Sequence, residues 1–290
     1  MKLIVKFNLM FIGMFLLGLS VAGSISYSLL QKNAREEILQ NARIMMQSTL
    51  ATRSYTSTQI APLLQTQMKY TFLPQTVSAY AATETFNFLR NAYPEFTYKE
   101  ATLNPTNPRD RATDWEADIV NQFRNNENVK EVIGERETPT GRALYLAQPL
   151  RIPSEACLQC HSTVDAAPPT MVEKYGNANG FGWKLHEIVG AQVVTVPSDV
   201  PLQRANQAFQ MFMLSLTGVF LFIFVVLNLM LYKMVIRPVT RLSKLADEVS
   251  LGNLDAPEFP AKGKDEIGAL GASFDRMRKS LVKALNLLEE

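Results

Sequence analysis

Two long stretches without a charged residue constrain this chain more than any other feature. The first covers the 25 residues that follow Lys6, and the second covers the 28 residues that follow Arg204. A helix needs about 20 apolar residues to cross a bilayer, because every backbone group must be hydrogen-bonded within the segment. We therefore expect transmembrane helices at residues 9–30 and 209–232, which argues against a soluble cytosolic enzyme.

The first apolar block allows two interpretations. Ser20-Val21-Ala22 resembles the small-residue cleavage site of a secretory signal peptide, which would remove the block from the mature protein. A retained anchor is favoured, because the uncharged run is longer than the roughly 7–15 residues of a usual signal sequence. In both interpretations, the chain that follows the first block is exported.

Each apolar block has basic residues without neighbouring acids at one end only, and this asymmetry predicts the orientation. At the opposite ends the charges are mixed, because Lys32 and Arg35 lie beside Glu36 and Glu37, and Arg204 faces Asp199. Excess Lys and Arg mark the cytoplasmic ends of membrane helices. We therefore expect residues 1–8 and 233–290 in the cytoplasm and residues 31–204 in the periplasm, as a two-pass protein of the cell inner membrane. The basic residues that carry this prediction are Lys2, Lys6, Lys233, Arg237, Arg241 and Lys244.

The overall charge excludes one class of partner. The chain has 29 basic and 27 acidic residues, for a net charge of +2. A protein that binds nucleic acid carries a concentrated basic surface, and this balance provides none. We expect the membrane and other proteins as partners.

Periodicity in the exported segment predicts helices first and strands afterwards. A small antiparallel sheet behind leading helices indicates an α+β domain of the PAS or Cache type. Pro62 is expected to kink or end the first helix, and Asp114 to cap the third. The expected helices cover residues 31–68, 76–90 and 114–123, and the expected strands cover 96–101, 129–137, 143–152 and 189–196, with a hairpin between the second and third strands.

One short motif in the sequence predicts a specific chemistry. Cys157-Leu158-Gln159-Cys160-His161 is C-x-x-C-H, the attachment pattern of c-type haem. Two thiols three positions apart can each add to a vinyl group on the same edge of the porphyrin, and the adjacent imidazole can ligate the iron. We expect one covalent haem c, bound through Cys157 and Cys160, with His161 as an axial ligand.

Three other readings of the motif are weaker. The C-x-x-C pair is expected to close a hairpin strand, whereas a redox pair opens a helix of a βαβ unit. Zinc needs a fourth ligand, and the only other histidine is His186. A plain disulfide would leave His161 without a role.

The rest of the haem environment stays open at this point. The sixth iron ligand can be His186, water or one of the exported methionines. Phe181 and Trp183, in a glycine-rich run, either pack on the porphyrin or belong to the core. Arg142 and Arg151 either pair with propionates or are ordinary surface charges. The exported methionines are Met45, Met46, Met68 and Met171.

The C-terminal tail resembles a HAMP domain. The features that carry the resemblance are Pro238 after the second block, the Gly252-Asn253-Leu254 turn and the segment Asp265-Glu266-Ile267-Gly268. The resemblance implies a homodimeric relay to a cytoplasmic output protein, whose identity is unknown. Two heptad seams separated by residues 255–264 also predict a parallel four-helix coiled coil from two chains. The seams are Val239, Leu242, Ala246 and Val249, then Ile267, Leu270, Phe274, Met277, Leu281, Ala284 and Leu288.

The exported segment resembles the bacterial c-type haem domains with a PAS-like fold. The residues that carry this resemblance are NPTNPRD at 104–110, PLRIPSEACLQCH at 149–161, and GNANGFGW at 176–183 followed by GAQVVTV at 190–196. The resemblance implies one haem used for redox or gas sensing, with no enzymatic reaction. We therefore expect a haem-c sensor that signals through its HAMP coiled coil, or alternatively a membrane-tethered electron-transfer cytochrome. An enzyme is the least favoured reading, because no distal acid–base pair is evident.

Overall fold

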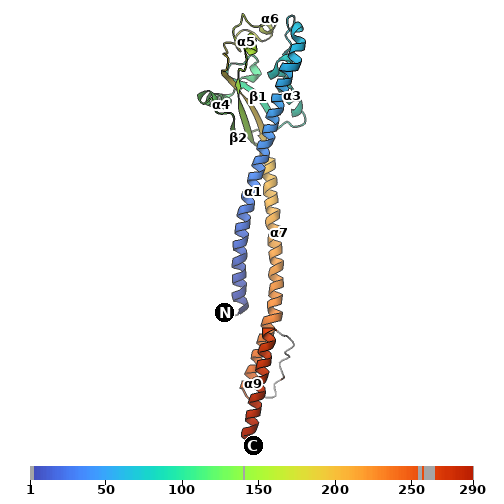
Figure 1. The fold of residues 1–290 in the computed structure, drawn as a ribbon, viewed down its shortest axis with the longest axis vertical. Coiled ribbons are helices and arrows are strands. Elements are labelled where there is room, and N and C mark those ends of the chain that lie inside the picture. Colours follow the sequence, from blue (N-terminus) through green and yellow to red (C-terminus); the bar gives the residue numbers. More distant parts are fainter. Residues whose placement is uncertain (1–2, 140, 254–256, 258–264, 290) are drawn as a thin grey trace. The chain divides into compact units, whose positions relative to one another are not determined.

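A computed structural model of the chain describes residues 3–139, 141–253, 257 and 265–289 (Figure 1). It contains two compact units, one formed by Met1–Ser26 with Phe209–Glu290 and the other by Tyr27–Ala208. Most of the expected connector at residues 255–264 lies outside the described residues. The mixed helix and sheet composition agrees with the α+β prediction.

The first helix is longer than expected at its start and shorter at its end. The helix α1 covers Leu3–Tyr55 and gives way to a π-helical turn, η1, at Thr56–Ile60. A 3₁₀ turn at Ala61–Leu64 (η2) and a single α turn at Gln65–Met68 (α2) follow. Pro62 lies at the start of η2, where its missing N–H group is tolerated, so the predicted break is confirmed.

The next two helices lie close to their predicted positions. A short 3₁₀ turn at Pro74–Thr76 (η3) precedes α3, Ser78–Arg90. The helix α4 covers Asp114–Asn125, but its N-cap is Thr113, so the expectation that Asp114 caps it is wrong. The backbone N–H of Thr113 donates to Glu116 at 2.8 Å, which completes a capping box.

Four antiparallel strands form one sheet in the order β1-β4-β3-β2. The strands are β1 (Thr97–Thr102), β2 (Val132–Thr138), β3 (Gly141–Arg151) and β4 (Ile188–Pro197). The pairing of β2 with β3 confirms the predicted hairpin. Every residue of β4 except the last is buried, as is typical of a strand covered on both faces.

Helices cover both faces of the sheet. On one face α1 and α3 pack against β1, β3 and β4, through a core that includes Ile38, Met46, Phe86, Leu146 and Val194. On the other face α4 packs through Ile119, Val120 and Phe123 against Ala147, Ala191 and Val193. The sheet is therefore packed on both faces, and each face has its own core.

Two short helices lie between β3 and β4. The helix α5 covers Glu155–His161 and α6 covers Pro169–Tyr175. Neither helix was expected, because each is only two turns long and lacks a full helical period. Their position places the C-x-x-C-H motif on a helix instead of a strand.

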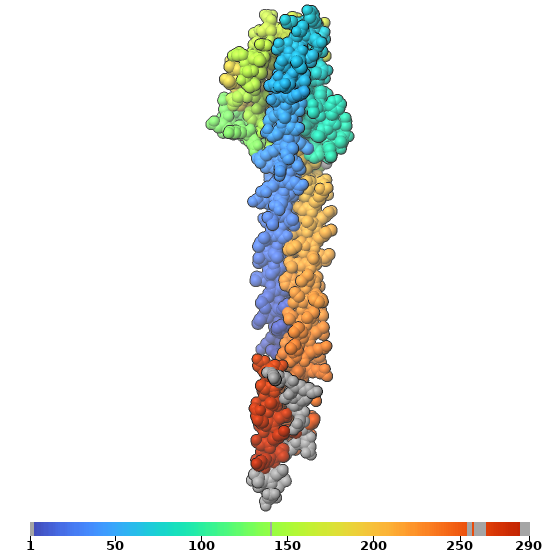
Figure 2. Space-filling model, turned by 45° about the vertical axis from the view of Figure 1, so that its right-hand side comes forward, coloured from blue at the N-terminus to red at the C-terminus, as the bar shows by residue number. Residues whose placement is uncertain are grey.

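Among the described residues, two helices are long and apolar enough to span a membrane, and they flank the central domain in the chain. The second is α7, Asp199–Leu231. Within the first unit, Phe11 contacts Phe224 with ring centroids 5.6 Å apart, and Phe15 contacts Phe220 at 4.3 Å. These pairings run in opposite directions, so α1 and α7 pack antiparallel there, as the blue and orange surfaces of Figure 2 show.

A π-helical turn at Tyr232–Ile236 (η5) joins α7 to α8, Arg237–Ser250, and α9 covers Glu266–Glu289. Leu242, Leu245 and Val249 of α8 form a small core with Phe274 of α9. Leu245 takes the buried position expected for Ala246. Leu270 and Met277 are 50% and 60% exposed, so much of the predicted seam has no cover within one chain.

Candidate functional site

The C-x-x-C-H motif forms α5, and the expectation that it closes a hairpin strand is wrong. The strand β3 ends at Arg151, and Pro153 follows without a backbone N–H group to continue the ladder. Ser154, in extended conformation, is the N-cap residue of α5. The helix therefore begins just before Cys157 and carries both thiols and His161.

The imidazole of His161 is held in one tautomer. Its Nδ1 atom lies 2.8 Å from the carbonyl oxygen of Gly180, with the Thr106 hydroxyl 3.4 Å away. A carbonyl only accepts hydrogen bonds, so Nδ1 carries the proton and Nε2 carries the lone pair. A histidine that ligates a metal is oriented in this way, because the N–H on its other side is fixed by a second partner.

The carbonyl that orients His161 depends on a glycine. Gly180 has φ +87°, and a Cβ there would lie 2.0 Å from the Thr106 hydroxyl and 2.8 Å from its Cα. Asn104 holds the same segment, because its side chain accepts from Gly180 N at 3.1 Å and donates to Phe181 O at 3.2 Å. The loop at residues 104–106 thus fixes the hydrogen-bond acceptor of His161.

Backbone bonds align the glycine-rich segment with the end of α5. Gly182 N donates to Ser162 O at 2.8 Å, and Trp183 N donates to His161 O at 3.1 Å. The Trp183 indole consequently lies parallel to the imidazole, with ring centroids 4.0 Å apart and 16° between the planes. Trp183 therefore stacks on His161 and restricts the rotation of its ring.

The two thiols have different surroundings. Cys160 packs at the edge of an apolar cluster formed by Phe72, Ala167 and Met171, to which Phe181 also belongs. Burial raises the pKa of the Cys160 thiol, and Cys157 adds to the rise. Both cysteines are partly exposed and form no disulfide.

These groups fit a c-type haem. Two unpaired thiols and one oriented imidazole share a helix, which is the donor set that covalent attachment requires. Burial lowers the pKa of His161, against the opposing effect of the Gly180 bond, so the neutral ligating form is favoured. Within the described part of the chain, no group of three or more His, Cys, Asp or Glu side chains could hold a metal ion. A tetrahedral zinc site therefore lacks its ligands there.

The other residues considered from sequence lie in ordinary structural roles. His186 occupies a turn with φ +65°, and its backbone N–H donates a hydrogen bond to the carbonyl oxygen of Ile152 at 2.9 Å. Arg142 pairs with Glu137, and Arg151 pairs with Glu127. Of the methionines, Met46 of α1 lies in the core against the sheet, whereas Met68 and Met171 belong to the cluster beside Cys160.

A buried ionic network joins α1 to the sheet, and no motif or period in the sequence predicts it. Arg53 forms an ion pair with Glu100 of β1, and Glu100 is only 2% exposed. Tyr98 donates to Glu100 at 2.8 Å, and Gln192 of β4 donates to Tyr98 at 3.2 Å. Burial lowers the pKa of Arg53, but the charge and hydrogen bond of Glu100 together with Tyr98 raise the pKa overall, so the guanidinium stays charged.

Comparison with known proteins gives two family matches. The family described as Tll0287-like matches residues 31–197, and the HAMP domain matches residues 230–283. Among solved structures, the crystal structure of the cyanobacterial heme-protein Tll0287 is similar, with 18% identity and a TM-score of 0.44. The alignment covers 56% of this chain and 95% of that chain. A search of curated proteins found no match.

Proposed function

The chain belongs to the Tll0287-like family and carries a HAMP domain, and from this premise we propose that it is a membrane-bound haem-c sensor. In this proposal the exported domain holds one covalent haem and is not an enzyme. The HAMP domain places the protein in signal transduction. It would relay the state of the haem to a cytoplasmic output protein.

One observation carries the haem assignment. The Nδ1 proton of His161 is committed to Gly180 O at 2.8 Å, so the lone pair on Nε2 is available to a metal. Cys157 and Cys160 precede it on the same helix, where each thiol can add its S–H across one vinyl group. Bound there, the haem would supply an iron that changes oxidation state or binds a small gas.

A route from this site to the membrane helices supports the sensor proposal. The loop that fixes His161 continues from β1, and Glu100 of β1 pairs with Arg53 of α1. A change in packing at the iron can reach α1 through this strand. The signal itself must come from a difference in stability between two arrangements of the helices.

The orientation and the oligomeric state also belong to the proposal. The basic flanks support an inner-membrane protein with residues 31–204 in the periplasm and both termini in the cytoplasm. The antiparallel packing of α1 and α7 in the first unit supports the two-pass arrangement. Exposed Leu270 and Met277 support a homodimer, because a second copy would cover them.

A membrane-tethered cytochrome is the second candidate, since the same haem site can transfer electrons to a redox partner. The HAMP domain favours the sensor, because an electron carrier has no need of a cytoplasmic relay. Cross-linking distinguishes the sensor from the tethered cytochrome. Single cysteines replace Leu270 or Met277 in the full chain, and disulfide formation is measured in membranes with the haem oxidised and then reduced.

We expect the cross-linking yield at these two positions to change with the state of the iron. A cysteine at Arg276, outside the seam, serves as the matched control and should cross-link weakly in both states. Identical yields in the two states would favour the tethered cytochrome over the sensor.

A further inference from the structure

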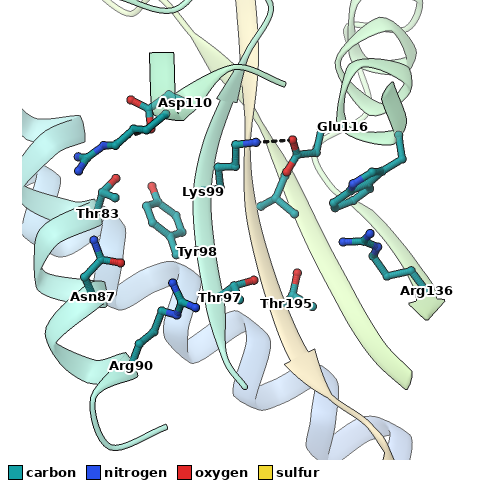
Figure 3. A pocket seen from close by; sticks show the side chains of 13 residues that line it. Thr83, Asn87, Arg90, Thr97, Tyr98, Lys99, Asp110, Glu116, Arg136 and Thr195 are labelled. Atoms are coloured by element: carbon teal, nitrogen blue, oxygen red, sulfur yellow. Dashed lines mark hydrogen bonds and ion pairs between the residues drawn. The ribbon is translucent and has the colours of Figure 1, made fainter. Parts of the chain in front are cut away.

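A pocket of 280 Å³ lies in the exported unit beside the edge strand β1. Side chains of α3 line one side and those of α4 and β2 the other, and β1 and β4 run between them (Figure 3). Its lining contains no residue of α5 or of the 176–183 segment. This pocket is therefore separate from the proposed haem site.

Two of the cations around this pocket have no compensating charge. Lys99 is neutralised by Glu116 at 2.7 Å, and Arg109 is paired with Glu84. By contrast, no carboxylate of the described residues forms an ion pair with Arg90 or Arg136. The six charged groups of the lining therefore give a net positive site: Arg90, Lys99, Arg109, Arg136, Asp110 and Glu116.

Two hydroxyl groups lie between these arginines. Thr97 and Thr195 are direct partners in the β1–β4 ladder, so their side chains point to the same face of the sheet. Thr195 is only 6% exposed, and neither hydroxyl has a hydrogen-bond partner among the residues that the structure describes. Neither oxygen is among the fully buried unpartnered polar atoms of the described residues, so both hydroxyls are accessible from the pocket and can donate to a ligand that accepts hydrogen bonds.

The pocket also has an apolar wall. The guanidinium of Arg136 lies 4.1 Å from the ring centroid of Trp115, which holds the cation in place. Val193 lines the pocket beside it. Figure 3 shows Arg90 reaching in from α3 and Arg136 from β2, with Thr97 and Thr195 between them. Cations, hydroxyl donors and an apolar wall thus surround one small volume.

We propose that this pocket binds a small organic carboxylate and gives the exported domain a second input. The guanidinium groups of Arg90 and Arg136 bind the carboxylate, because a planar fork of N–H donors matches its two oxygens. Thr97 and Thr195 donate to the same anion, and Trp115 covers its apolar part. At 280 Å³ the pocket is smaller than most drug-sized sites, so the ligand has few heavy atoms.

Calorimetric titration of the full chain in nanodiscs of neutral lipid tests the proposal. The probes are acetate, succinate, benzoate and inorganic phosphate, each at constant ionic strength and pH 7. The variants are Arg90→Gln and Arg136→Gln, and Arg142→Gln is the matched control, because Arg142 lies outside the pocket and is an exposed surface arginine. Thr195→Val removes a hydroxyl donor while keeping a good strand former, and so tests the site independently of the arginines.

We expect saturable binding of at least one carboxylate by the wild type. Loss of one guanidinium should weaken carboxylate binding about tenfold or more, because a charge-assisted hydrogen bond to the anion is lost. Thr195→Val should weaken it by less, and Arg142→Gln should bind as the wild type does. Absence of saturable carboxylate binding, unchanged affinity in both arginine variants, or binding of phosphate alone would overturn the proposal. Circular dichroism confirms that each variant is folded.

Discussion

The indole of Trp183 lies parallel to the imidazole of His161, with ring centroids 4.0 Å apart and 16° between their planes. The backbone bond from Trp183 N to His161 O sets this arrangement, and the bond from His161 Nδ1 to Gly180 O completes it. The imidazole is therefore fixed on its face and at one nitrogen. Such preorganisation is what a metal ligand requires.

Replacing Gly180 by alanine should displace the acceptor of His161. The new Cβ would lie 2.8 Å from the Thr106 Cα, and the residue would keep a strained φ of +87°. We expect a loss of about 1–3 kcal/mol in the free energy of unfolding, measured by chemical denaturation. Gly182→Ala is the control, because Gly182 has a similar φ of +82° but nothing within 4 Å of its added Cβ.

The difference between these two variants isolates the clash from the backbone strain. Gly180→Ala should also alter the spectrum of the haem-loaded protein, whereas Gly182→Ala should alter it less. Equal effects of the two substitutions would mean that the contact with Thr106 does not position the Gly180 carbonyl.

Replacing Glu100 by glutamine should be strongly destabilising. The substitution keeps the size of the side chain but leaves the mostly buried Arg53 without its counter-charge. Removing one partner of a buried ion pair costs about 3–5 kcal/mol. The comparison is Glu137→Gln at the exposed Arg142–Glu137 pair, where we expect a change of no more than about 1 kcal/mol by the same denaturation assay. Similar losses for both would refute the structural role of the Arg53–Glu100 link.

Asp110 should make the stability depend on pH in a defined direction. Burial raises the pKa of its carboxyl to about 6, although Arg109 opposes the rise. Between pH 4 and pH 6 the folded state then binds more protons than the unfolded state, so stability falls as the pH rises through this range. The loss is at most about 3 kcal/mol, and solvent screening reduces it.

Denaturant unfolding of the wild type and of Asp110→Asn, from pH 4 to pH 7, measures this contribution. The variant has no carboxyl to titrate, so its stability relative to the wild type should increase as the pH rises. A constant difference across the range would show that the carboxyl titrates near its ordinary pKa.

The exposed seam of α9 should carry dimerisation. Leu270 is 50% exposed within one chain, and burial of a leucine contributes about 1.5–3 kcal/mol, so Leu270→Glu should weaken association of the tail. Lys283→Glu changes the charge at an exposed position outside the seam and serves as control. The yield of cross-linked dimer is measured for both variants, with the full chain in membranes. Equal yields from the two would place the dimer contact elsewhere.

The elements with a clear period were predictable, and those fixed by tertiary contacts were not. Alternation located the strands within a few residues, and apolar length located α1 and α7. Thr113 caps α4 in place of Asp114 because Glu116 completes its capping box, a choice that spacing alone does not decide. The two-turn helix α5 was missed because so short an element has no period.

The candidate site was predictable only in its covalent chemistry. The motif itself marks Cys157, Cys160 and His161, whatever the fold. The residues that orient His161 lie about 20 residues after it and more than 50 before it, and only the folded chain brings them together. The glycine-rich run at 176–183 and the asparagine–proline loop at 104–110 can both be recognised in the sequence. The sequence does not predict that they contact each other through Asn104 and Gly180.

In the proposed function, His161, Cys157 and Cys160 hold one covalent haem. The most direct measurement is the intact mass of the full chain, produced together with the c-type maturation machinery, followed by the absorption spectrum. We predict the mass of one haem added and resistant to acid extraction, lost in the Cys157→Ala, Cys160→Ala double variant, and a changed spin state in His161→Ala. An unmodified mass, or haem that persists in the double variant, would show that these residues do not hold a covalent haem.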